Sequence, residues 1–434
     1  MRRAMLTADL KEGQEHAHLA QGSNSPAPSL VYALCGIAAV VEGFDLQTGG
    51  MAAPRFAAEF HLAPDHVGLI FLLTSLGLAL GASFGGWLGD RAGSGRAMGA
   101  SIMLFGLASI GAALATSEMT LLIARGVVGL GLGGSLPNMI AQLTATGPAA
   151  MAPRRVTLSI AGMSVGALIV GLIAFLAKEI GWRTMFHLSG WIPLVFGVIV
   201  WLLLPCAAQP NRSLPAQDDK PSEGWRALFG GPHLRVTLLF WFAFFISTAM
   251  SYLLIYWMPT FLTRSGMDQH QVGLGMIGFS IGAAAGPTLL AVLMRPGRTV
   301  RVVCLAYGGI MLGLLMVINA PVSPSYLSFA LGFTGLFTAG AQAVLYGIVG
   351  LFYPDAARGV GVGSSVAIGR IGSGVVPALA GMMLAAGLSQ NLVLAAAIPM
   401  LVLALGALLI LLRHPPAALQ GKRQTSWSSD HTKK

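Results

Sequence analysis

Residues 41–48 read Val-Glu-Gly-Phe-Asp-Leu-Gln-Thr and place two carboxylates, Glu42 and Asp45, inside the first long apolar segment. A charged side chain at the centre of a membrane helix costs roughly 2.5 to 3.5 kcal/mol on insertion scales, so it needs a partner or a water-filled cavity. The alternative is a helix that begins later and leaves both acids in water. Against it, residues 30–41 are too short to span a bilayer, which takes about 20 residues. We therefore expect both acids to lie in the membrane and to have a function.

The composition predicts an integral membrane protein. Of 434 residues, 55% are hydrophobic and only 10% are charged, and the mean hydropathy is +0.74. Three scattered cysteines, Cys35, Cys206 and Cys304, indicate neither disulfides nor a metal site. Apolar runs long enough to span the membrane occur in two groups, near 30–53, 67–88, 98–116, 119–142, 156–177 and 184–204, and near 236–261, 271–294, 300–319, 324–351, 359–386 and 390–413. The predicted fold class is all-α, with twelve transmembrane helices in two six-helix pseudo-symmetric halves.

Loop charges predict the topology. The tails and alternate loops hold 20 of the 26 Lys and Arg residues, the opposite loops hold four, and two lie within membrane segments. Such a bias marks the cytoplasmic side, so both termini are expected there, and the net charge of +10 does not indicate a nucleic-acid partner. Residues 1–28 are polar and predict a tail instead of a cleaved signal peptide. The expected organisation is a cytoplasmic tail (1–28), a first half (29–205), a cytoplasmic linker (206–235), a second half (236–413) and a second tail (414–434).

The two halves repeat a local pattern. A loop with proline and arginine precedes a glycine-bearing helix both at 148–155 and at 354–358. Two six-helix halves are the architecture of alternating-access carriers, whereas a single-barrel channel would not require them.

Arg125 supplies the cation that the first helix requires. If that helix leaves the membrane near Ala53, Asp45 lies ~12 Å below the surface, and Arg125 lies ~10 Å in from Glu118 on the same side, at 1.5 Å per residue. The levels agree, so we expect an ion pair. It is either part of a transport mechanism or a fastening between two helices.

Residues 85–96, Gly-Gly-Trp-Leu-Gly-Asp-Arg-Ala-Gly-Ser-Gly-Arg, resemble the Gly-x-x-x-Asp-Arg-x-Gly-Arg-Arg/Lys loop of the major facilitator superfamily. The similarity holds through Gly93, after which Ser94-Gly95 displaces the expected basic pair. The resemblance implies a gating loop in which Asp90, Arg91 and Arg96 bind helix ends or opposite charges; the alternative is a solvated charged loop. The corresponding loop of the second half, 295–298, keeps its arginines but lacks the acid.

Glu42-Gly43-Phe44-Asp45 resembles the Asp-Gly-Phe/Tyr-Asp signature of the aromatic acid:proton symporters, a branch of that superfamily. Residues 125–138, 256–262 and 352–372 are similar to further segments of the branch, and the resemblance covers roughly 30–413. It departs at Glu42, where the branch usually has Asp, so the carboxylate moves outward by one methylene. The resemblance implies a multi-pass protein of the bacterial cytoplasmic membrane that is surrounded by lipid and is a monomer. It also implies that the protein carries a small aromatic carboxylate together with protons, and that it uses the proton gradient and no cofactor.

The acids and arginines suggest that a carboxylate of the protein and the substrate carboxylate compete for the same guanidinium. Glu42 and Asp45 share one helix face, so each raises the cost of ionising the other, and both are candidates for proton coupling. We expect Arg125 to pair with Asp45 in the empty carrier and to bind a substrate carboxylate once the acid is protonated. Arg370, ~16 Å into its helix, is a rival anchor for that carboxylate. Its alternative role is to bind carbonyl groups of the neighbouring glycine-rich backbone.

The remaining candidates are rings and amides. Aromatic rings would hold an aromatic substrate, although packing is the alternative for each one: Phe44, Tyr252, Tyr256, Trp257 and Tyr346. Polar side chains would bind ring hydroxyls: Gln47, Asn138, Gln142, Ser280 and Gln342. We expect His187 to be a packed histidine.

Two other functions compete with uptake. An exporter of organic anions or drugs by proton antiport is disfavoured because 159–171 carries Gly166-Ala167 where such exporters typically have a Gly-Pro pair. A membrane-embedded enzyme is disfavoured because no metalloprotease, nucleophile-elbow or phosphate-loop motif occurs. We therefore expect a transporter and no enzyme activity.

Overall fold

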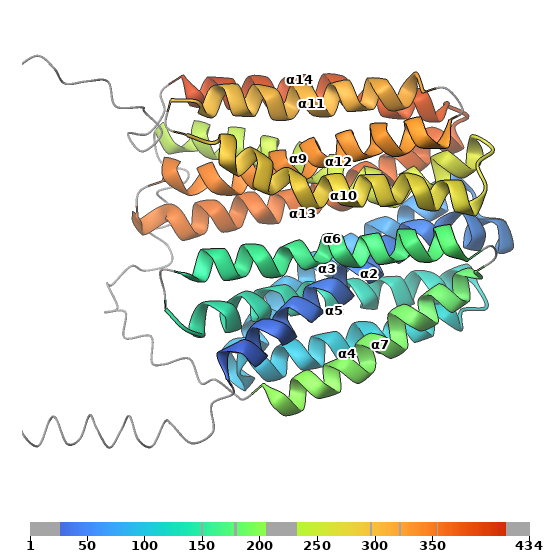
Figure 1. The fold of residues 1–434 in the computed structure, drawn as a ribbon, viewed down its shortest axis with the longest axis horizontal. Coiled ribbons are helices and arrows are strands. Elements are labelled where there is room, and N and C mark those ends of the chain that lie inside the picture. The colour runs from blue at the N-terminus through green and yellow to red at the C-terminus, as the bar shows by residue number, and fades with distance from the viewer. Residues whose placement is uncertain are drawn as a thin grey trace, which may run out of the picture.

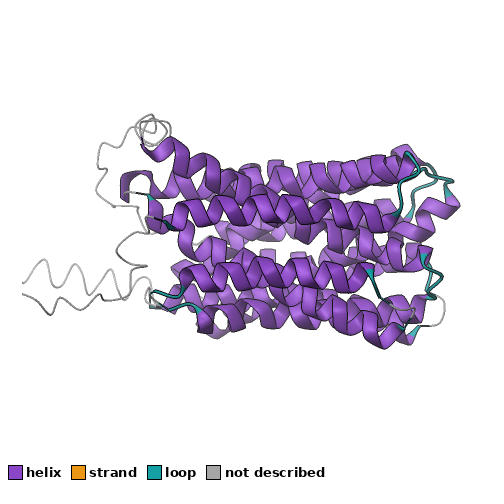
Figure 2. Cartoon of the chain, turned by 90° about the horizontal axis from the view of Figure 1, so that it is seen from above, coloured by secondary structure: helices purple, strands orange, loops and turns teal. Residues whose placement is uncertain are grey.

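The computed structural model describes residues 27–148, 151–177, 180–204, 232–295, 297–320, 323–353 and 355–413, with the backbone alone for 153, 232–233, 355–357 and 359. The second predicted tail, the first except for residues 27 and 28, Cys206 and most of the predicted linker lie outside these residues. The last part of that linker, from Pro232, belongs instead to a helix, because proline is favoured in the first turn. Every regular element in the described ranges is helical (Figure 2).

Twelve of the described helices are long and apolar enough to cross a membrane, which confirms the predicted fold class. The first six fill the lower part of Figure 1 and the last six the upper part. The first half contains α2 (Pro28–Glu59), α3 (Pro64–Ala92), α4 (Ser94–Ala113), α5 (Glu118–Ala145), α6 (Ala152–Leu176) and α7 (Trp182–Leu203). The second half contains α9 (Pro232–Arg264), α10 (Gln269–Leu293), α11 (Thr299–Ile318), α12 (Pro324–Val349), the short 3-10 helix η2 (Gly350–Phe352), α13 (Asp355–Ala385) and α14 (Gln390–Leu412).

Helix α2 runs six residues beyond the expected end at Ala53. Its last turn is held by Glu59, whose carboxylate accepts hydrogen bonds from Trp182 Nε1 (2.6 Å) and Arg183 Nη1 (2.5 Å) at the start of α7. These partners are more than 120 residues away in sequence, so the local hydrophobic pattern carried no signal for them.

In each half, two helices pack closely against each other at glycine residues. A Cβ atom on Gly81 of α3 would lie 2.0 Å from the Leu130 carbonyl oxygen of α5, and one on Gly282 of α10 would lie 1.8 Å from the Gly332 carbonyl oxygen of α12. Only glycine permits these backbones to approach so closely, as in membrane helix pairs that associate through small residues. The pairs α3–α5 and α10–α12 occupy equivalent positions in the two halves, so each half has a close-packed unit.

The halves contact each other mainly at one end of the bundle. We call the end where α2 and α9 begin the linker end, and the opposite end the far end. At the far end, Trp257 Nε1 of α9 donates to the Pro377 carbonyl oxygen of α13 (2.8 Å), and Gly68 of α3 packs against Ala378. Toward the linker end, Gly347 and Gly363 of the second half have no described atom within 4 Å of where a Cβ would stand.

Helices α2 and α9 cross near the far end. A Cβ on Gly50 would lie 2.2 Å from the Ile255 carbonyl oxygen. Pro54 in α2 and Pro259 in α9 each follow these crossing residues by four positions. Proline has no N–H, so neither carbonyl group at the crossing receives the usual helical hydrogen bond.

Candidate functional site: a buried acid and arginine cluster

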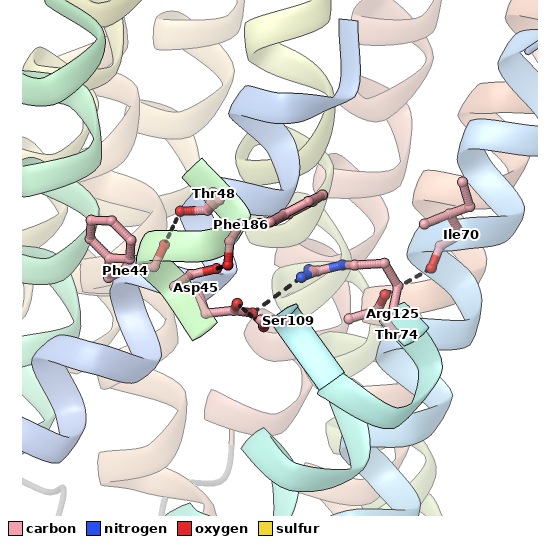
Figure 3. Close-up of polar contacts among 9 residues, drawn as sticks. Phe44, Asp45, Thr48, Ile70, Thr74, Ser109, Arg125 and Phe186 are labelled. Carbon is pink, nitrogen blue, oxygen red and sulfur yellow. Dashed lines mark hydrogen bonds and ion pairs between the residues drawn. The ribbon is translucent and has the colours of Figure 1, made fainter. Parts of the chain in front are cut away.

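Asp45 of α2 and Arg125 of α5 form an ion pair in the interior of the first half. Arg125 Nη1 lies 3.3 Å from Asp45 Oδ2, and the side chains are 2% and 0% exposed. Ser109 of α4 donates a hydrogen bond to the other carboxylate oxygen (2.8 Å), and the guanidinium lies over the Phe186 ring of α7 at 5.3 Å. Figure 3 shows Asp45 between Ser109 and Arg125. The expected pairing of these two residues is therefore confirmed.

The ion pair leaves part of the arginine unused. Within the described chain, Arg125 Nη2 has no hydrogen-bond partner. A Cβ on Gly49 would lie 2.6 Å from this atom, so the glycine provides the space for the guanidinium. An arginine with one free Nη can bind a further anion beside Asp45.

Glu42 has different surroundings from Asp45. It is 2% exposed, and its carboxylate accepts a short hydrogen bond from the Ser135 hydroxyl of α5. It lies within electrostatic range of Arg370, which belongs to the second half. Glu42 therefore links the charges of the two halves, whereas Asp45 pairs within the first half.

Arg370 is half-buried on α13, and Nη1 donates to the Tyr252 hydroxyl of α9 (2.7 Å). Tyr346 of α12 is 46% exposed and lies within electrostatic range of this guanidinium. Gln342, one turn before Tyr346, donates from Nε2 to the Thr248 hydroxyl (3.1 Å), while its Oε1 atom is buried without a partner among the described residues. The second half thus contributes to the candidate site the Arg370 guanidinium, the two phenol groups and the amide oxygen of Gln342.

The other predicted rings differ in position. Tyr256 stacks on Phe71 of α3 (centroids 4.4 Å apart) and lies within electrostatic range of Arg125 and Asp45. Trp257 is 1% exposed and fastens α9 to α13 at the far end. Phe44 is buried, and Figure 3 shows its ring on the side away from Arg125. Of these rings, Tyr256 lies nearest the charged cluster.

Two predicted amides hold helices together. Asn138 Nδ2 donates to the Gly85 and Gly134 carbonyl oxygens (2.7 and 2.8 Å), and Gln142 Nε2 donates to the Ser94 hydroxyl (3.0 Å). Both lie on α5 about 13 and 17 residues beyond Arg125, or ~20 and ~26 Å along the helix. Asn138 and Gln142 therefore fasten α5 to α3 and α4, and Asn138 lies three residues beyond Ser135, the partner of Glu42.

The remaining polar candidates differ in whether their side chains are already hydrogen-bonded. Ser280 donates to the Met276 carbonyl oxygen of its own helix (2.9 Å). Gln47 is 1% exposed, and its Nε2 atom has no partner in the described part of the chain; the same holds for His187 Nδ1. Gln47 is thus a buried donor two residues from Asp45.

The predicted gating loop is a tight turn. Gly93, with φ of 87°, separates α3 from α4, and Asp90, Arg91 and Arg96 are exposed around it. Arg91 lies over the Trp87 ring at 4.4 Å. The loop is fastened to α5 through the bond between Gln142 and Ser94.

Sequence reasoning missed three partners of the charged groups: Ser109, Ser135 and Phe186. Each lies in an apolar segment where a serine or phenylalanine is unremarkable, and only tertiary packing brings it to an acid or to Arg125. No cluster of three or more potential metal ligands occurs among the described residues.

Comparisons with known proteins agree with this architecture. The profile of the Major Facilitator Superfamily matches residues 35–322 and 265–431. The chain is 36% identical over 392 residues to the 3-(3-hydroxy-phenyl)propionate transporter of Escherichia coli (strain K12), covering 90% of this chain and 95% of the relative. It is 29% identical to the gentisate transporter of Corynebacterium glutamicum (81% and 80% covered) and 26% identical to the 4-hydroxybenzoate transporter PcaK of Pseudomonas aeruginosa (89% and 93%).

Solved structures show the same fold at low identity. The xylose transporter XylE from E. coli, in an inward open conformation, aligns with a TM-score of 0.70 at 15% identity, covering 88% of this chain and 96% of that one. A bacterial homologue of the lysosomal transporter Spinster, inward-facing and unoccupied, aligns with a TM-score of 0.69 at 16% identity (89% and 97% covered). These relatives and neighbours are transporters and not enzymes, as the sequence predicted.

Proposed function

Because this chain belongs to the major facilitator superfamily, we propose that it takes up a small aromatic carboxylate together with protons, by alternating access. That it is a multi-pass membrane transporter follows from the family. The substrate class is supported by relatives that transport 3-(3-hydroxyphenyl)propionate, gentisate and 4-hydroxybenzoate. These compounds share one ring, one carboxylate and at least one hydroxyl group.

The observation that carries the proposal is the buried pair of Asp45 and Arg125. Removing one partner of a buried ion pair leaves an uncompensated charge at a cost of about 3–5 kcal/mol. A proton on Asp45 neutralises the acid, and a substrate carboxylate then takes its place beside Arg125. Proton and anion thereby satisfy the same site together, and either one alone leaves a charge unpaired.

We assign the first contact with the substrate carboxylate to Arg370. This guanidinium is half-buried, whereas Arg125 is 2% exposed and already paired. Tyr252 and Tyr346 lie near it with their phenol groups, and we assign the acceptor for a ring hydroxyl group to Gln342 Oε1, which has no partner among the described residues. Glu42, in electrostatic range of Arg370, makes this binding sensitive to its own protonation.

We further propose that the linker end faces the cytoplasm of a bacterium and that the far end faces outward across the cytoplasmic membrane. The excess of Lys and Arg on the linker side supports this orientation. The contacts between halves at the far end then correspond to a carrier closed on the outside.

Uptake by proteoliposomes tests the proposal. Purified protein, with an outside-acid pH gradient, is given labelled benzoate, 4-hydroxybenzoate, gentisate and 3-(3-hydroxyphenyl)propionate. Symport with one proton permits up to about tenfold accumulation of the anion per pH unit, because each unit is worth about 1.4 kcal/mol. Arg125→Ala abolishes the uptake. Export along the same gradient, or undiminished uptake by Arg125→Ala, would refute the proposal.

The variant Asp45→Asn distinguishes proton coupling from substrate binding. The amide cannot carry a proton between the two sides, so the variant loses uphill uptake and retains exchange of external for internal substrate. Glu118→Gln is the matched control, since this acid bonds to His66 at the far end, outside the cluster. Uphill uptake by Asp45→Asn equal to that of the control would contradict the assignment of the proton to Asp45.

A further inference from the structure

Tyr256 belongs to α9 of the second half, but its phenol group lies among residues of the first half. The side chain is 0% exposed, and the hydroxyl oxygen has no hydrogen-bond partner among the described residues. Ser75 of α3 lies near the phenol without hydrogen-bond geometry to it, and its own hydroxyl group donates to the Ser373 carbonyl oxygen (3.2 Å). A buried hydroxyl group without a partner is costly, so Tyr256 is a donor that a ligand acceptor would satisfy.

Two consecutive glycines of α2 place this tyrosine at the same depth as the unpaired nitrogen of Arg125. A Cβ on Gly49 would lie 2.6 Å from Arg125 Nη2, and one on Gly50 would lie 3.2 Å from Tyr256 Cα. Consecutive residues of a helix differ in height by about 1.5 Å. The Tyr256 ring stacks on Phe71 of α3 with centroids 4.4 Å apart, so it extends from α9 into the first half. Two unpaired donors, one from each half, therefore lie beside α2 at one level.

Tyr256 lies within electrostatic range of both arginines of the candidate site. In the first half it is in range of Arg125 and Asp45, and in the second half of Arg370. Its ring contacts the edge of the Tyr252 ring (centroids 5.5 Å apart), and the Tyr252 hydroxyl group accepts from Arg370 Nη1 (2.7 Å). A carboxylate that moves from Arg370 to Arg125 therefore comes within reach of the Tyr256 hydroxyl group.

A carboxylate suits two donors that face each other. It has two oxygen atoms and only accepts hydrogen bonds, and bonds to an ionised acceptor are stronger than bonds between neutral groups. We propose that Tyr256 completes the carboxylate site of Arg125 from the opposite half, with one substrate oxygen bonded to Arg125 Nη2 and the other to the Tyr256 hydroxyl group. This deepens the proposed function, on which the identity of the ligand rests.

A carboxylate held in this way favours a closed far end. Arg125 belongs to the first half and Tyr256 to the second, so both can bond to one carboxylate only while the halves stay together where α2 and α9 cross. Opening of the far end moves α9 away and removes the Tyr256 contact. A ligand shifts an equilibrium between two states only by the difference in its affinity for them, and that difference is here one hydrogen bond. Bound substrate thus keeps the far end closed until the linker end releases it.

Binding of two ligands to purified protein tests the contact. Calorimetry measures the Kd of 3-(3-hydroxyphenyl)propionate and of 3-phenylpropionate, which lacks the ring hydroxyl group. Tyr256→Phe weakens the binding of both about tenfold, because both have the carboxylate. Tyr307→Phe is the matched control: this buried phenol of the second half bonds to Ser247 (2.5 Å), and its variant binds both ligands as the wild type does. Unchanged affinities in Tyr256→Phe, a loss confined to the hydroxylated ligand, or an equal loss in the control would each overturn the inference.

Double electron–electron resonance tests the effect on closure. Spin labels are attached at Met119→Cys and Leu388→Cys, two exposed positions at the far end of opposite halves. The background lacks the native cysteines and carries Arg55→Ala and His270→Ala, which remove two bonds between the halves at that end. Saturating 3-phenylpropionate increases the population with the shorter distance several-fold when Tyr256 is retained, and leaves it unchanged in Tyr256→Phe. An equal increase in both proteins, or no increase in either, would refute the closing role.

Uphill uptake by the wild type is measured in parallel. Intact uptake together with full affinity in Tyr256→Phe refutes the role of Tyr256 alone. Absence of both binding and uptake of the aromatic acids by the wild type refutes the proposed function.

Discussion

Asp45 and Arg125 neutralise each other in a buried site. We therefore expect substitutions at the two positions to have non-additive effects on the free energy of unfolding. At 3.3 Å and an effective dielectric constant of about 20, the attraction between the two charges is about 5 kcal/mol. Arg125→Gln removes that attraction and leaves a carboxylate that is 0% exposed with Ser109 as its one remaining polar partner among the described contacts. We expect this variant to lose about 3–5 kcal/mol of unfolding free energy.

The double variant Asp45→Asn with Arg125→Gln should recover most of this loss. Its two neutral amides no longer require a counter-charge and can bond to each other, so we expect its stability to lie within about 1–2 kcal/mol of the wild type. Asp45→Asn alone leaves Arg125 unpaired and should resemble Arg125→Gln. The coupling free energy calculated from the wild type, the two single variants and the double variant measures the interaction between the two charged side chains.

The assay is equilibrium unfolding of detergent-solubilised protein with increasing sodium dodecyl sulfate, followed by tryptophan fluorescence. Arg298→Gln, an exposed arginine between α10 and α11, is the control and should change stability by less than about 0.5 kcal/mol. If the double variant is as unstable as the sum of the two single variants, or if Arg125→Gln costs no more than the control, the reasoning about a buried charge pair is wrong.

Three further predictions concern space, positioning and closure. Gly49→Ala places a methyl group 2.6 Å from Arg125 Nη2 and should reduce the initial uptake rate at least tenfold. Gly36→Ala, on the same helix, would add a methyl group with no described atom within 4 Å and should leave the rate unchanged; equal rates for the two variants would refute the steric argument. Tyr252→Phe removes the acceptor of Arg370 and should raise the KM for uptake about tenfold. Tyr307→Phe, which loses a bond to Ser247, should not, and a KM unchanged in Tyr252→Phe would rule out this positioning role. Arg55→Ala combined with His270→Ala removes the bonds to Gln269 and to the Phe175 carbonyl oxygen that join the halves at the far end. In a background without native cysteines, Thr260→Cys should then react several times faster with a thiol reagent added on the far side, and an unaltered rate would show that these bonds do not hold the halves closed.

Membrane physics made much of the fold predictable. Uninterrupted apolar segments of about 20 residues have few alternatives to a spanning helix, so their number followed from the sequence. The depth of a charge along a straight helix also follows from residue counting, and this matched Asp45 with Arg125.

Side-chain direction and long-range partners were not predictable. Asn138 and Gln142 lie on the same helix as Arg125, but their amides bond to α3 and to Ser94. Ser109 and Ser135 reach the acids only because α4 and α5 pack beside α2, and a hydrophobic pattern does not state which helices are neighbours.

The crossing of α2 and α9 has a consequence for the transport cycle. Proline removes a main-chain bond from each helix at the point of contact, and a helix bends most easily where such a bond is missing. The last turns of both helices, beyond Pro54 and Pro259, can therefore bend while the close-packed pairs α3–α5 and α10–α12 stay rigid. Bending these two ends is not enough to open the far end, because α3 must also separate from α13 and α6 from α10.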